Sequence, residues 1–218
     1  MRIEAEAVLF DNDGVLVDSH APTGAGWRRI CDAYGMDFVE VSAQLAGVRA
    51  IDTLARFLPA DQVDEAFARL EQFEIDESDG VVAIPGALDL VAALPAGRWT
   101  IVTSATPPLA EVRWRHAGIT PPVPHITADD VERGKPHPDP FLAGAEALGV
   151  DPTRCVVFED SPSGGAAGAA AGATVIAVGD QPWEFTPAAR VPDLRSARVV
   201  APDSNDAAAP IVLEIDAD

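Results

Sequence analysis

The sequence predicts an α/β fold, with a parallel sheet covered by helices on both faces and a further group of helices inserted near the N-terminus. Four short apolar segments are typical of buried parallel strands and lie at residues 5–10, 99–102, 155–158 and 174–178. Helical patterns separate the later strands, and this alternation favours a parallel sheet. The gap between the first two strands is too long for a single crossover helix. We therefore expect a core of residues 1–18 and 84–218 and a helical cap of residues 19–83.

The core helices and the tail follow from the same patterns. Helices are predicted at 87–94, 109–117, 140–148 and 164–172. Gly118 and Gly149 directly follow two of them and are good C-terminal stop signals. The last helix, GGAAGAAAG, consists of small residues, so we expect it to lie close against the sheet. The tail from about residue 181 is rich in Pro, Ala and Asp, and we expect one more strand near 197–200 and a loosely held end.

The predicted cap contains four amphipathic helices, at residues 26–34, 41–45, 51–57 and 61–75. In the last of these, Val63, Phe67 and Leu70 recur at roughly helical spacing with acidic residues between them. The segment at 76–80, Asp-Glu-Ser-Asp-Gly, suits a hinge that returns the chain to the core. The alternative is that these helices pack directly on the sheet.

Composition restricts the partners of the chain. The 218 residues include 15 basic and 35 acidic side chains, which gives a net charge of -20, and 48% of the residues are hydrophobic. This balance argues against nucleic acid and anionic membranes as partners, but not against a small anionic substrate. No apolar run reaches membrane-spanning length, and acids interrupt the would-be signal region. Cys31 and Cys155 match no disulfide framework or metal motif, so we expect free cysteines and a cytoplasmic location. We also expect a monomer.

An acidic pair directly follows the first predicted strand. Asp11 and Asp13 stand one residue apart, and β alternation places them on one face if the strand continues. Two carboxylates so close together need a cation between them or must differ in protonation. A metal-bound carboxylate can act as a nucleophile and its neighbour as an acid. The alternative is an acidic turn, since Asp-Gly is common in turns.

Two further predicted strands also end in polar residues. Thr103 and Ser104 follow the strand at 99–102, where hydroxyl groups and free backbone amides suit a phosphate, although a turn or helix cap is the alternative. Glu159 and Asp160 follow the strand at 155–158. Oxygen-rich sites dominated by carboxylates select Mg²⁺. A second acidic pair at the same edge of the sheet therefore predicts a magnesium site.

A single lysine, Lys135, lies in the segment GKPHPDP at 134–140. Its three alternating prolines stiffen the backbone and limit where the side chain can point. A lysine can hold a phosphoryl oxygen or screen two carboxylates, whereas a solvated loop lysine is the alternative. Two acidic pairs, one lysine and one pair of hydroxyls at one sheet edge form a constellation suited to phosphoryl transfer.

Over residues 5 to about 180 the chain resembles the haloacid dehalogenase-like superfamily. The segments that carry the resemblance are DNDGVLVDS at 11–19, Thr103-Ser104, GKP at 134–136, and Glu159-Asp160-Ser161 before the glycine-rich helix. The resemblance implies a Rossmann-like core with a helical cap inserted after the first motif. Asn12 departs from the usual pattern, which has an apolar residue there. We expect its side chain to point away from Asp11 and to need a hydrogen-bond partner.

The resemblance also implies a Mg²⁺-dependent reaction and assigns roles to the matching positions. Asp11 would be the nucleophile that forms an aspartyl-phosphate, and Asp13 the general acid and then base. Lys135 would bridge the phosphate and Asp11. The metal would bind the carboxylates of Asp11 and Asp160 and the backbone carbonyl of Asp13, with Glu159 in its outer environment. Dehalogenases of the family lack the second acid, so Asp13 argues against dehalogenation.

The substrate implied by the resemblance is a small sugar or polyol phosphate. The segment LAGVR at 45–49 resembles the substrate-specificity segment of phosphatases for such compounds, and Arg49 would pair with substrate hydroxyls or a phosphate. The alternative is a surface arginine. Either Thr103 or Ser104 would hold a phosphoryl oxygen, and the sequence leaves the choice open. The segment GKPHPDPFL at 134–142 resembles that of glycerol- and 2-deoxyglucose-phosphate phosphatases.

Two other functions remain open on the same fold. A phosphosugar mutase is one alternative, but the related mutases usually carry a histidine where this chain has Thr23, and His20 is out of register. A non-enzymatic protein that binds a phosphorylated metabolite is the other. The complete set of Asp11, Asp13, Lys135 and Asp160 counts against it, because a binding protein has no need of a nucleophile. The sequence therefore favours a phosphatase.

Overall fold

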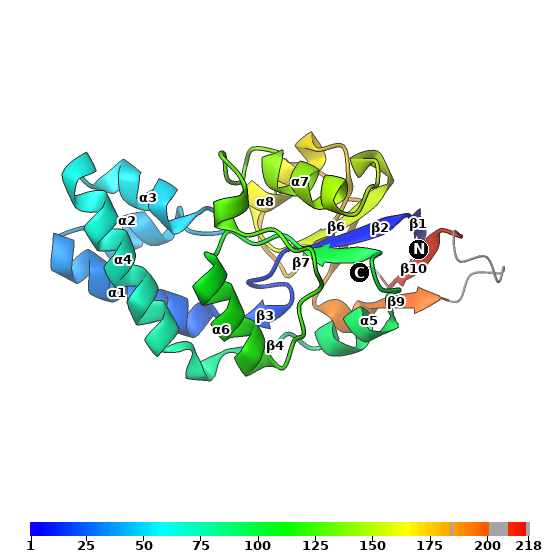
Figure 1. Cartoon of the computed structure of the whole chain (residues 1–218), viewed down its shortest axis with the longest axis horizontal. Coiled ribbons are helices and arrows are strands. Elements are labelled where there is room, and N and C mark those ends of the chain that lie inside the picture. The colour runs from blue at the N-terminus through cyan, green and yellow to red at the C-terminus, as the bar shows by residue number, and fades with distance from the viewer. Residues whose placement is uncertain (184, 201–208, 217–218) are drawn as a thin grey trace.

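The helices expected near the N-terminus gather at one end of the molecule. The computed structural model describes residues 1–183, 185–200 and 209–216. Figure 1 shows these helices on one side and the sheets on the other. The four helices are α1 (His20–Tyr34), α2 (Phe38–Ser42), α3 (Ala50–Phe57) and α4 (Ala60–Asp76).

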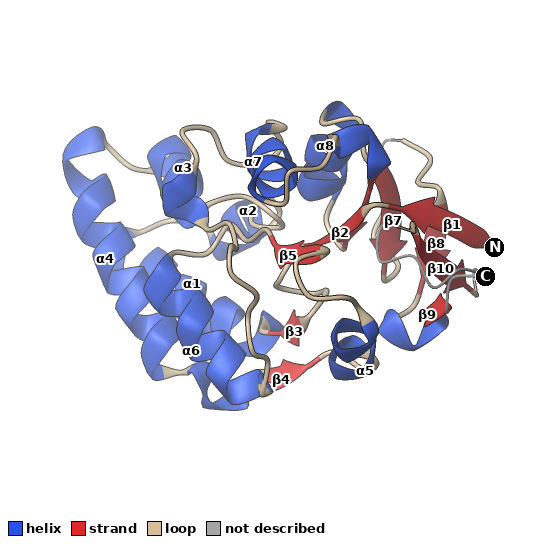
Figure 2. Cartoon of the chain, turned by 45° about the vertical axis from the view of Figure 1, so that its right-hand side comes forward, coloured by secondary structure: helices blue, strands red, loops and turns tan. Residues whose placement is uncertain are grey.

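The core is built on a five-stranded sheet in which every neighbouring pair is parallel. In spatial order its strands are β5 (Trp99–Ile101), β2 (Ala7–Phe10), β6 (Cys155–Glu159), β7 (Thr174–Val178) and β8 (Ala189–Val191). This arrangement confirms the predicted α/β class. All four predicted strand regions contribute to it, whereas β8 was not predicted. Figure 2 shows helices on both sides of these strands.

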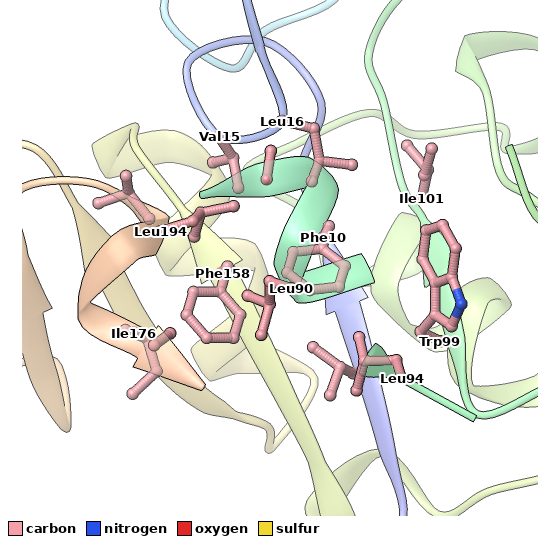
Figure 3. Close-up of a cluster of buried hydrophobic side chains, with 14 of the residues drawn as sticks. Phe10, Val15, Leu16, Leu90, Leu94, Trp99, Ile101, Phe158, Ile176 and Leu194 are labelled. Carbon is pink, nitrogen blue, oxygen red and sulfur yellow. The ribbon is translucent and has the colours of Figure 1, made fainter. Parts of the chain in front are cut away.

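Alternation along β2 divides the core into two layers. Val8 and Phe10 pack in one cluster with α5 (Ala87–Ala93) and α6 (Pro107–Ala117), whereas Leu9 packs in a second cluster with α7 (Asp139–Ala147) and α8 (Pro162–Ala170). In the first layer the rings of Phe10 and Phe158 stack with their centroids 5.2 Å apart. Figure 3 shows this pair beside Leu90 of α5. Strand β2 is therefore buried on both faces, which explains its unbroken apolar sequence.

A second, three-stranded sheet ties the N-terminus to the tail. The strand predicted at 5–10 is β2 with a later start, because the chain breaks at Glu6 and Ala5 ends a separate strand, β1 (Arg2–Ala5), which was not predicted. Strand β1 pairs antiparallel with β10 (Ile211–Ile215), which pairs antiparallel with β9 (Ala197–Val200). The strand predicted near 197–200 is thus confirmed.

The expectation of a loosely held end is wrong for the segment 211–215. Ile211, Leu213 and Ile215 are buried in the first core layer, because alternate residues of β10 point to the same face. The rest of the tail to which this expectation applied, residues 201–208 and 217–218, lies outside the described residues.

The helices α1 to α4 pack on one another rather than directly on the sheet. They share a separate buried cluster that includes Trp27, Ile30, Leu54 and Leu70. The chain enters and leaves this group through β3 (Val17–Asp18) and β4 (Val82–Ala83), which pair antiparallel. We use "cap" for residues 19–83 and "core" for the remainder, with the boundaries that the sequence predicts.

The remaining elements are short. Single 3-10 turns occupy Ser78–Gly80, Ala128–Asp130, Pro152–Arg154 and Leu194–Ser196. Cys31 and Cys155 are buried and free, as predicted. Within the described part of the chain, no helix has both the length and the apolar character needed to cross a bilayer.

Candidate active site

Three neighbouring strands bring the predicted polar residues to one edge of the sheet. Asp11 directly follows β2, Thr103 lies two residues after β5, and Glu159 ends β6. The order β5-β2-β6 makes these strand ends neighbours. The backbone amide of Asp11 donates to the carbonyl of Phe158 at 2.9 Å, so the strand pairing extends to the acidic residue itself.

Lys135 is buried between two of the predicted acids. Its Nζ donates to Asp11 Oδ1 at 2.5 Å, to Glu159 Oε1 at 2.7 Å and to the backbone carbonyl of Val102 at 3.1 Å. Burial opposes its charged form, but the Asp11 and Glu159 carboxylates raise the pKa of Lys135. The side chain is completely buried, so the alternative of a solvated loop lysine is wrong.

The carboxylates beside Lys135 form a cluster suited to a divalent cation. Asp11, Glu159 and Asp160 each place one oxygen within 4.8 Å of the others. Burial, opposed by Lys135 and reinforced by Glu159, raises the pKa of Asp11 to about 7. Burial and the neighbouring acids also raise the pKa of Asp160. Three carboxylates against one ammonium leave an excess of negative charge, and oxygen donors are the ligands that Mg²⁺ prefers.

Glu159 and Asp160 differ in the number of hydrogen bonds that their carboxylates accept from the protein. Glu159 Oε2 accepts from both the backbone amide and the hydroxyl of Ser161, each at 2.9 Å, and Oε1 accepts from Lys135. No hydrogen bond or ion pair to the Asp160 side chain occurs among the described residues. Of the two acids, Asp160 is therefore the one whose oxygens accept no hydrogen bond from the described residues.

Two glycines allow the backbone to approach these acids closely. A Cβ on Gly164, in the first turn of α8, would lie 1.6 Å from Glu159 Oε1. Gly14 has a φ of +86°, and a Cβ there would lie 2.0 Å from Asp160 Oδ2. Any other residue at either position would displace an acidic side chain, so both glycines are part of the site.

Asp13 is held by three donors from different parts of the chain. Its Oδ1 accepts from Ser19 Oγ at 2.6 Å and pairs with Arg113 Nη1 at 2.9 Å, and its Oδ2 accepts from Asn12 Nδ2 at 3.2 Å. Asn12 Oδ1 in turn accepts from the indole N–H of Trp114 at 2.8 Å, which is the partner that its buried amide was expected to need. Asn12 therefore supports Asp13 from the segment that follows β2.

The two hydroxyl residues after β5 have different surroundings. Thr103 is buried, and its Oγ1 accepts from the backbone amide of Ala105 at 3.0 Å. Ser104 lines the cavity between cap and core and donates to the backbone carbonyl of Gly47 at 2.8 Å. Ser104 thus contacts the cap segment that was predicted to select the substrate.

The cavity above the acidic cluster is bounded by both cap and core. Its volume is about 1110 Å³, and both Asp11 and Asp13 line it. Cap residues that line it include Thr23, Trp27 and Phe67. Its size suits a small ligand held between the two parts of the molecule.

Arg49 also lines this cavity, and its guanidinium spans the boundary between cap and core. Within the cap, Nε and Nη2 donate to the Asp52 carboxylate at 2.7 and 3.1 Å. Toward the core, Nη1 donates to the backbone carbonyls of Val131 at 3.1 Å and Ala128 at 3.4 Å, and Nη2 donates to that of Glu132 at 3.0 Å. All five N–H groups are therefore engaged. A direct contact with substrate requires one of these bonds to open.

Sequence reasoning missed two charged residues beside the cavity, Arg113 and Glu74. Arg113 Nη2 donates to Thr23 Oγ1 at 2.9 Å and lies 3.4 Å from Glu74 Oε1. Burial, opposed by Arg113, raises the pKa of Glu74 to about 7. A signal was present: each stands in the apolar stripe of its helix, Arg113 between Leu109 and Ala117 and Glu74 four residues after Leu70.

Comparison with known proteins identifies relatives along most of the chain. Residues 5–172 match the sequence profile of the haloacid dehalogenase-like hydrolases. Hexitol phosphatase A of Escherichia coli is 42% identical over 181 residues, which cover 81% of this chain and 84% of that protein. Glycerol-1-phosphate phosphohydrolase 2 of Saccharomyces cerevisiae is 36% identical, with 82% and 76% covered. The structure of CbbY from Rhodobacter sphaeroides shares the fold, with a TM-score of 0.73, 23% identity, and 87% and 95% covered.

Proposed function

The chain belongs to the haloacid dehalogenase-like hydrolase family and is a phosphoric monoester hydrolase, and we propose that it hydrolyses a small sugar or polyol phosphate through a phosphorylated Asp11. The observation that carries the proposal is the Asp11–Lys135–Glu159 arrangement at the edge of the sheet, with Asp160 beside it and Asp13 on the same cavity. The groups proposed as nucleophile, fixed cation, metal ligands and proton donor therefore lie close to one another.

Asp11 is the nucleophile in this proposal. One Asp11 oxygen is held by Lys135, which leaves the other to attack the phosphorus of the substrate. The bond from phosphorus to the alcohol oxygen breaks, and the phosphoryl group is transferred to Asp11. The Lys135 ammonium keeps Asp11 in place and offsets the negative charge of the two reacting anions.

Asp13 transfers the protons. It donates a proton to the leaving alcohol oxygen, and then, as a carboxylate, takes a proton from the water that attacks the phosphoryl group on Asp11. Inorganic phosphate leaves and Asp11 is regenerated, so the protons and bonds balance over one cycle. The position of Asp13 on the cavity beside Asp11 supports this role.

Mg²⁺ is the proposed cofactor, and Asp11, Asp160 and the backbone carbonyl of Asp13 would hold it, with Glu159 as an outer partner. When bound, the ion neutralises charge on the carboxylate and the phosphate, which lets two anions react. The buried oxygen donors and the raised pKa values of Asp11 and Asp160 support this assignment.

A small hydroxylated substrate suits the cavity and the relatives. The cavity combines aromatic residues such as Trp27 and Phe67 with hydroxyl and carboxylate groups, which can pack against a carbon chain and bind its hydroxyls. Hexitol and glycerol phosphates are named as substrates of the two curated relatives. We propose that Thr103 or Ser104 binds the phosphoryl group and that Arg49 contributes to substrate binding from the cap.

Phosphate release tests the proposal. The protein with Mg²⁺ is expected to release phosphate from a panel of hexitol, glycerol and deoxysugar phosphates, and Asp11→Asn is expected to reduce the rate by more than about 10⁴-fold. Asp129→Asn, an acid on the same cavity outside the proposed mechanism, serves as the matched control. Full activity of Asp11→Asn would contradict the mechanism, and an isomeric product without free phosphate would indicate a mutase instead.

A further inference from the structure

Arg113 is a buried link between Asp13 and the cap. It belongs to α6 of the core, and the residue is 5% exposed. Its Nη1 lies 2.9 Å from Asp13 Oδ1, and its Nη2 donates to Thr23 Oγ1 at 2.9 Å and lies 3.4 Å from Glu74 Oε1. Thr23 belongs to α1 and Glu74 to α4, which lie alongside α6 in Figure 2. One side chain thus joins the proposed proton donor to two cap helices.

Packing alone does not account for an arginine at this position. The neighbouring buried residues on α6 include Leu109, Ala110 and Trp114. A buried ion pair is often no more stabilising than apolar residues of similar volume, because both charges lose their hydration. The guanidinium also leaves its buried Nε without a partner among the described residues. These costs indicate a role that an apolar residue could not fill.

The orientation of Asp13 supplies that role. Arg113 and Ser19 both bind Oδ1, while Asn12 binds the other oxygen, Oδ2. The Asp13 side chain nevertheless keeps 30% of its surface exposed, and it lines the cavity with Asp11. The carboxylate is therefore fixed in direction but open to a substrate. Efficient proton transfer requires such fixed geometry.

We propose that Arg113 is a positioning residue that orients Asp13 for proton transfer and ties this orientation to the cap through Glu74 and Thr23. The inference rests on the proposed function, because it requires Asp13 to be the general acid and base. Arg113 itself exchanges no proton, since its guanidinium remains charged. Removal of Arg113 therefore impairs those steps in which Asp13 moves a proton.

The leaving group of the substrate reveals this effect. A hexitol or glycerol alkoxide needs a proton from Asp13, whereas p-nitrophenolate departs without one. The ratio kcat/KM reports the steps up to departure of the alcohol. Arg113→Met is therefore expected to lower kcat/KM about 10- to 100-fold for the alkyl phosphate and less than about threefold for p-nitrophenyl phosphate. Equal losses for both substrates, or no loss, would overturn the inference.

Three variants separate positioning from structural damage. Arg115→Met removes an exposed arginine from the same helix and should leave both ratios unchanged. Arg113→Met/Glu74→Gln removes both buried charges and so leaves no unpaired carboxylate at position 74. It should show the same selective loss of kcat/KM for the alkyl phosphate as Arg113→Met. Arg113→Lys keeps a positive charge but loses the bidentate guanidinium, so we expect a selective loss of kcat/KM smaller than that of Arg113→Met. The circular dichroism spectrum of each variant verifies folding.

The connection to the cap has its own test. Glu74→Gln weakens the cap contact of Arg113 but leaves Asp13 and its other donors intact. We expect a selective loss of about three- to tenfold in kcat/KM for the alkyl phosphate, smaller than that of Arg113→Met. Unchanged kinetics in Glu74→Gln would overturn the cap part of the proposal.

A double-mutant cycle distinguishes failure of this inference from failure of the proposed function. Asp13→Asn/Arg113→Met should be no slower on the alkyl phosphate than Asp13→Asn alone, because Arg113 acts through Asp13. Losses that multiply would overturn the inference. If Asp13→Asn itself slows both substrates equally, the proton-transfer role of Asp13 fails and the inference falls with it. A selective Asp13→Asn together with an unselective Arg113→Met overturns the inference alone.

Discussion

At the scale of single residues, the charge of Lys135 makes the acidic edge of the sheet possible. Its ammonium is fully buried and contacts both Asp11 and Glu159, so it offsets the charge of two carboxylates that have little access to water. The same contacts fix the direction of the Asp11 carboxylate. We therefore expect both the stability of this edge and the proposed catalysis to depend on this side chain.

Replacement of Lys135 tests this dependence. Lys135→Met leaves two buried carboxylates unpaired, so the free energy of unfolding in EDTA is expected to fall by about 3 to 5 kcal/mol, and phosphatase activity should be lost. Denaturant titration and phosphate release measure the two effects. Arg133→Met removes an exposed cation two residues away and should change neither. A Lys135→Met protein as stable as the parent would contradict the account.

Gly164 tests the close approach of α8 to Glu159. Gly164→Ala places a methyl group where the Glu159 carboxylate now lies, so we expect Glu159 to move and the Mg²⁺ concentration for half-maximal activity to rise at least about tenfold. Gly24→Ala is the matched control for stability, because nothing lies within 4 Å of that Cβ and alanine favours the helix. An unchanged Mg²⁺ dependence in Gly164→Ala would show that Glu159 does not support the metal site.

The sequence allowed the acids and Lys135 to be predicted because each follows a recognisable strand or stands in a proline-stiffened loop. The donors that hold Asp13 could not be predicted in the same way. Ser19 and Arg113 reach it from positions 6 and 100 residues further along the chain. The only sequence signal for the burial of Arg113 is its position within the apolar stripe of its helix.

At the scale of secondary-structure elements, α4 and α6 meet through a buried carboxyl group. Burial raises the pKa of Glu74 from its ordinary value of 4.5 to about 7. The folded state therefore binds the proton more tightly than the unfolded state. The corresponding stability is complete below about pH 4.5 and is lost as the pH rises through about 7.

Glu74→Gln isolates this pH dependence. Between pH 4.5 and 7.5 the free energy of unfolding of the parent protein should fall by about 1 to 3 kcal/mol more than that of the variant. Urea titrations of both proteins at several pH values give the comparison. Parallel pH profiles would mean that Glu74 is not the group responsible.

Element prediction succeeded for the central strands that are buried on both faces and missed β1, β8 and β10. Strands β2, β6 and β7 each contain an unbroken run of four apolar residues, which is the pattern of a covered parallel sheet. Strand β1 is separated from β2 by a single glutamate, and its partner β10 lies near the other end of the chain. No local pattern indicates such a pairing, so neither β1 nor β10 was predicted.

At the scale of the whole molecule, Arg49 joins the cap to the core. Its hydrogen bonds to the carbonyls of Val131 and Glu132 run from the cap to the core. Ser104 of the core adds a hydrogen bond to the cap carbonyl of Gly47. The sequence identified this cap segment but not its docking partner, because the partner is a set of backbone carbonyls far along the chain. Carbonyl acceptors carry no sequence signal.

Arg49→Met separates a role between cap and core from a role in substrate binding. Loss of the cross-boundary bonds is expected to speed hydrogen exchange at 45–49 in the substrate-free protein and to raise KM about tenfold or more. Arg56→Met, an exposed cap arginine bonded to Gln44, is the control. Unchanged exchange with a raised KM would assign Arg49 to substrate binding alone.

The central claim is that phosphate passes through Asp11. The measurement that tests it most directly is rapid acid quench of the enzyme during turnover of a hexitol phosphate, followed by mass spectrometry of the peptide that contains residues 8–19. The account predicts a phosphoryl group on Asp11 in the parent protein and none in Asp11→Asn. Steady phosphate release with no phosphorylation of Asp11, or a labelled side chain elsewhere, would contradict it.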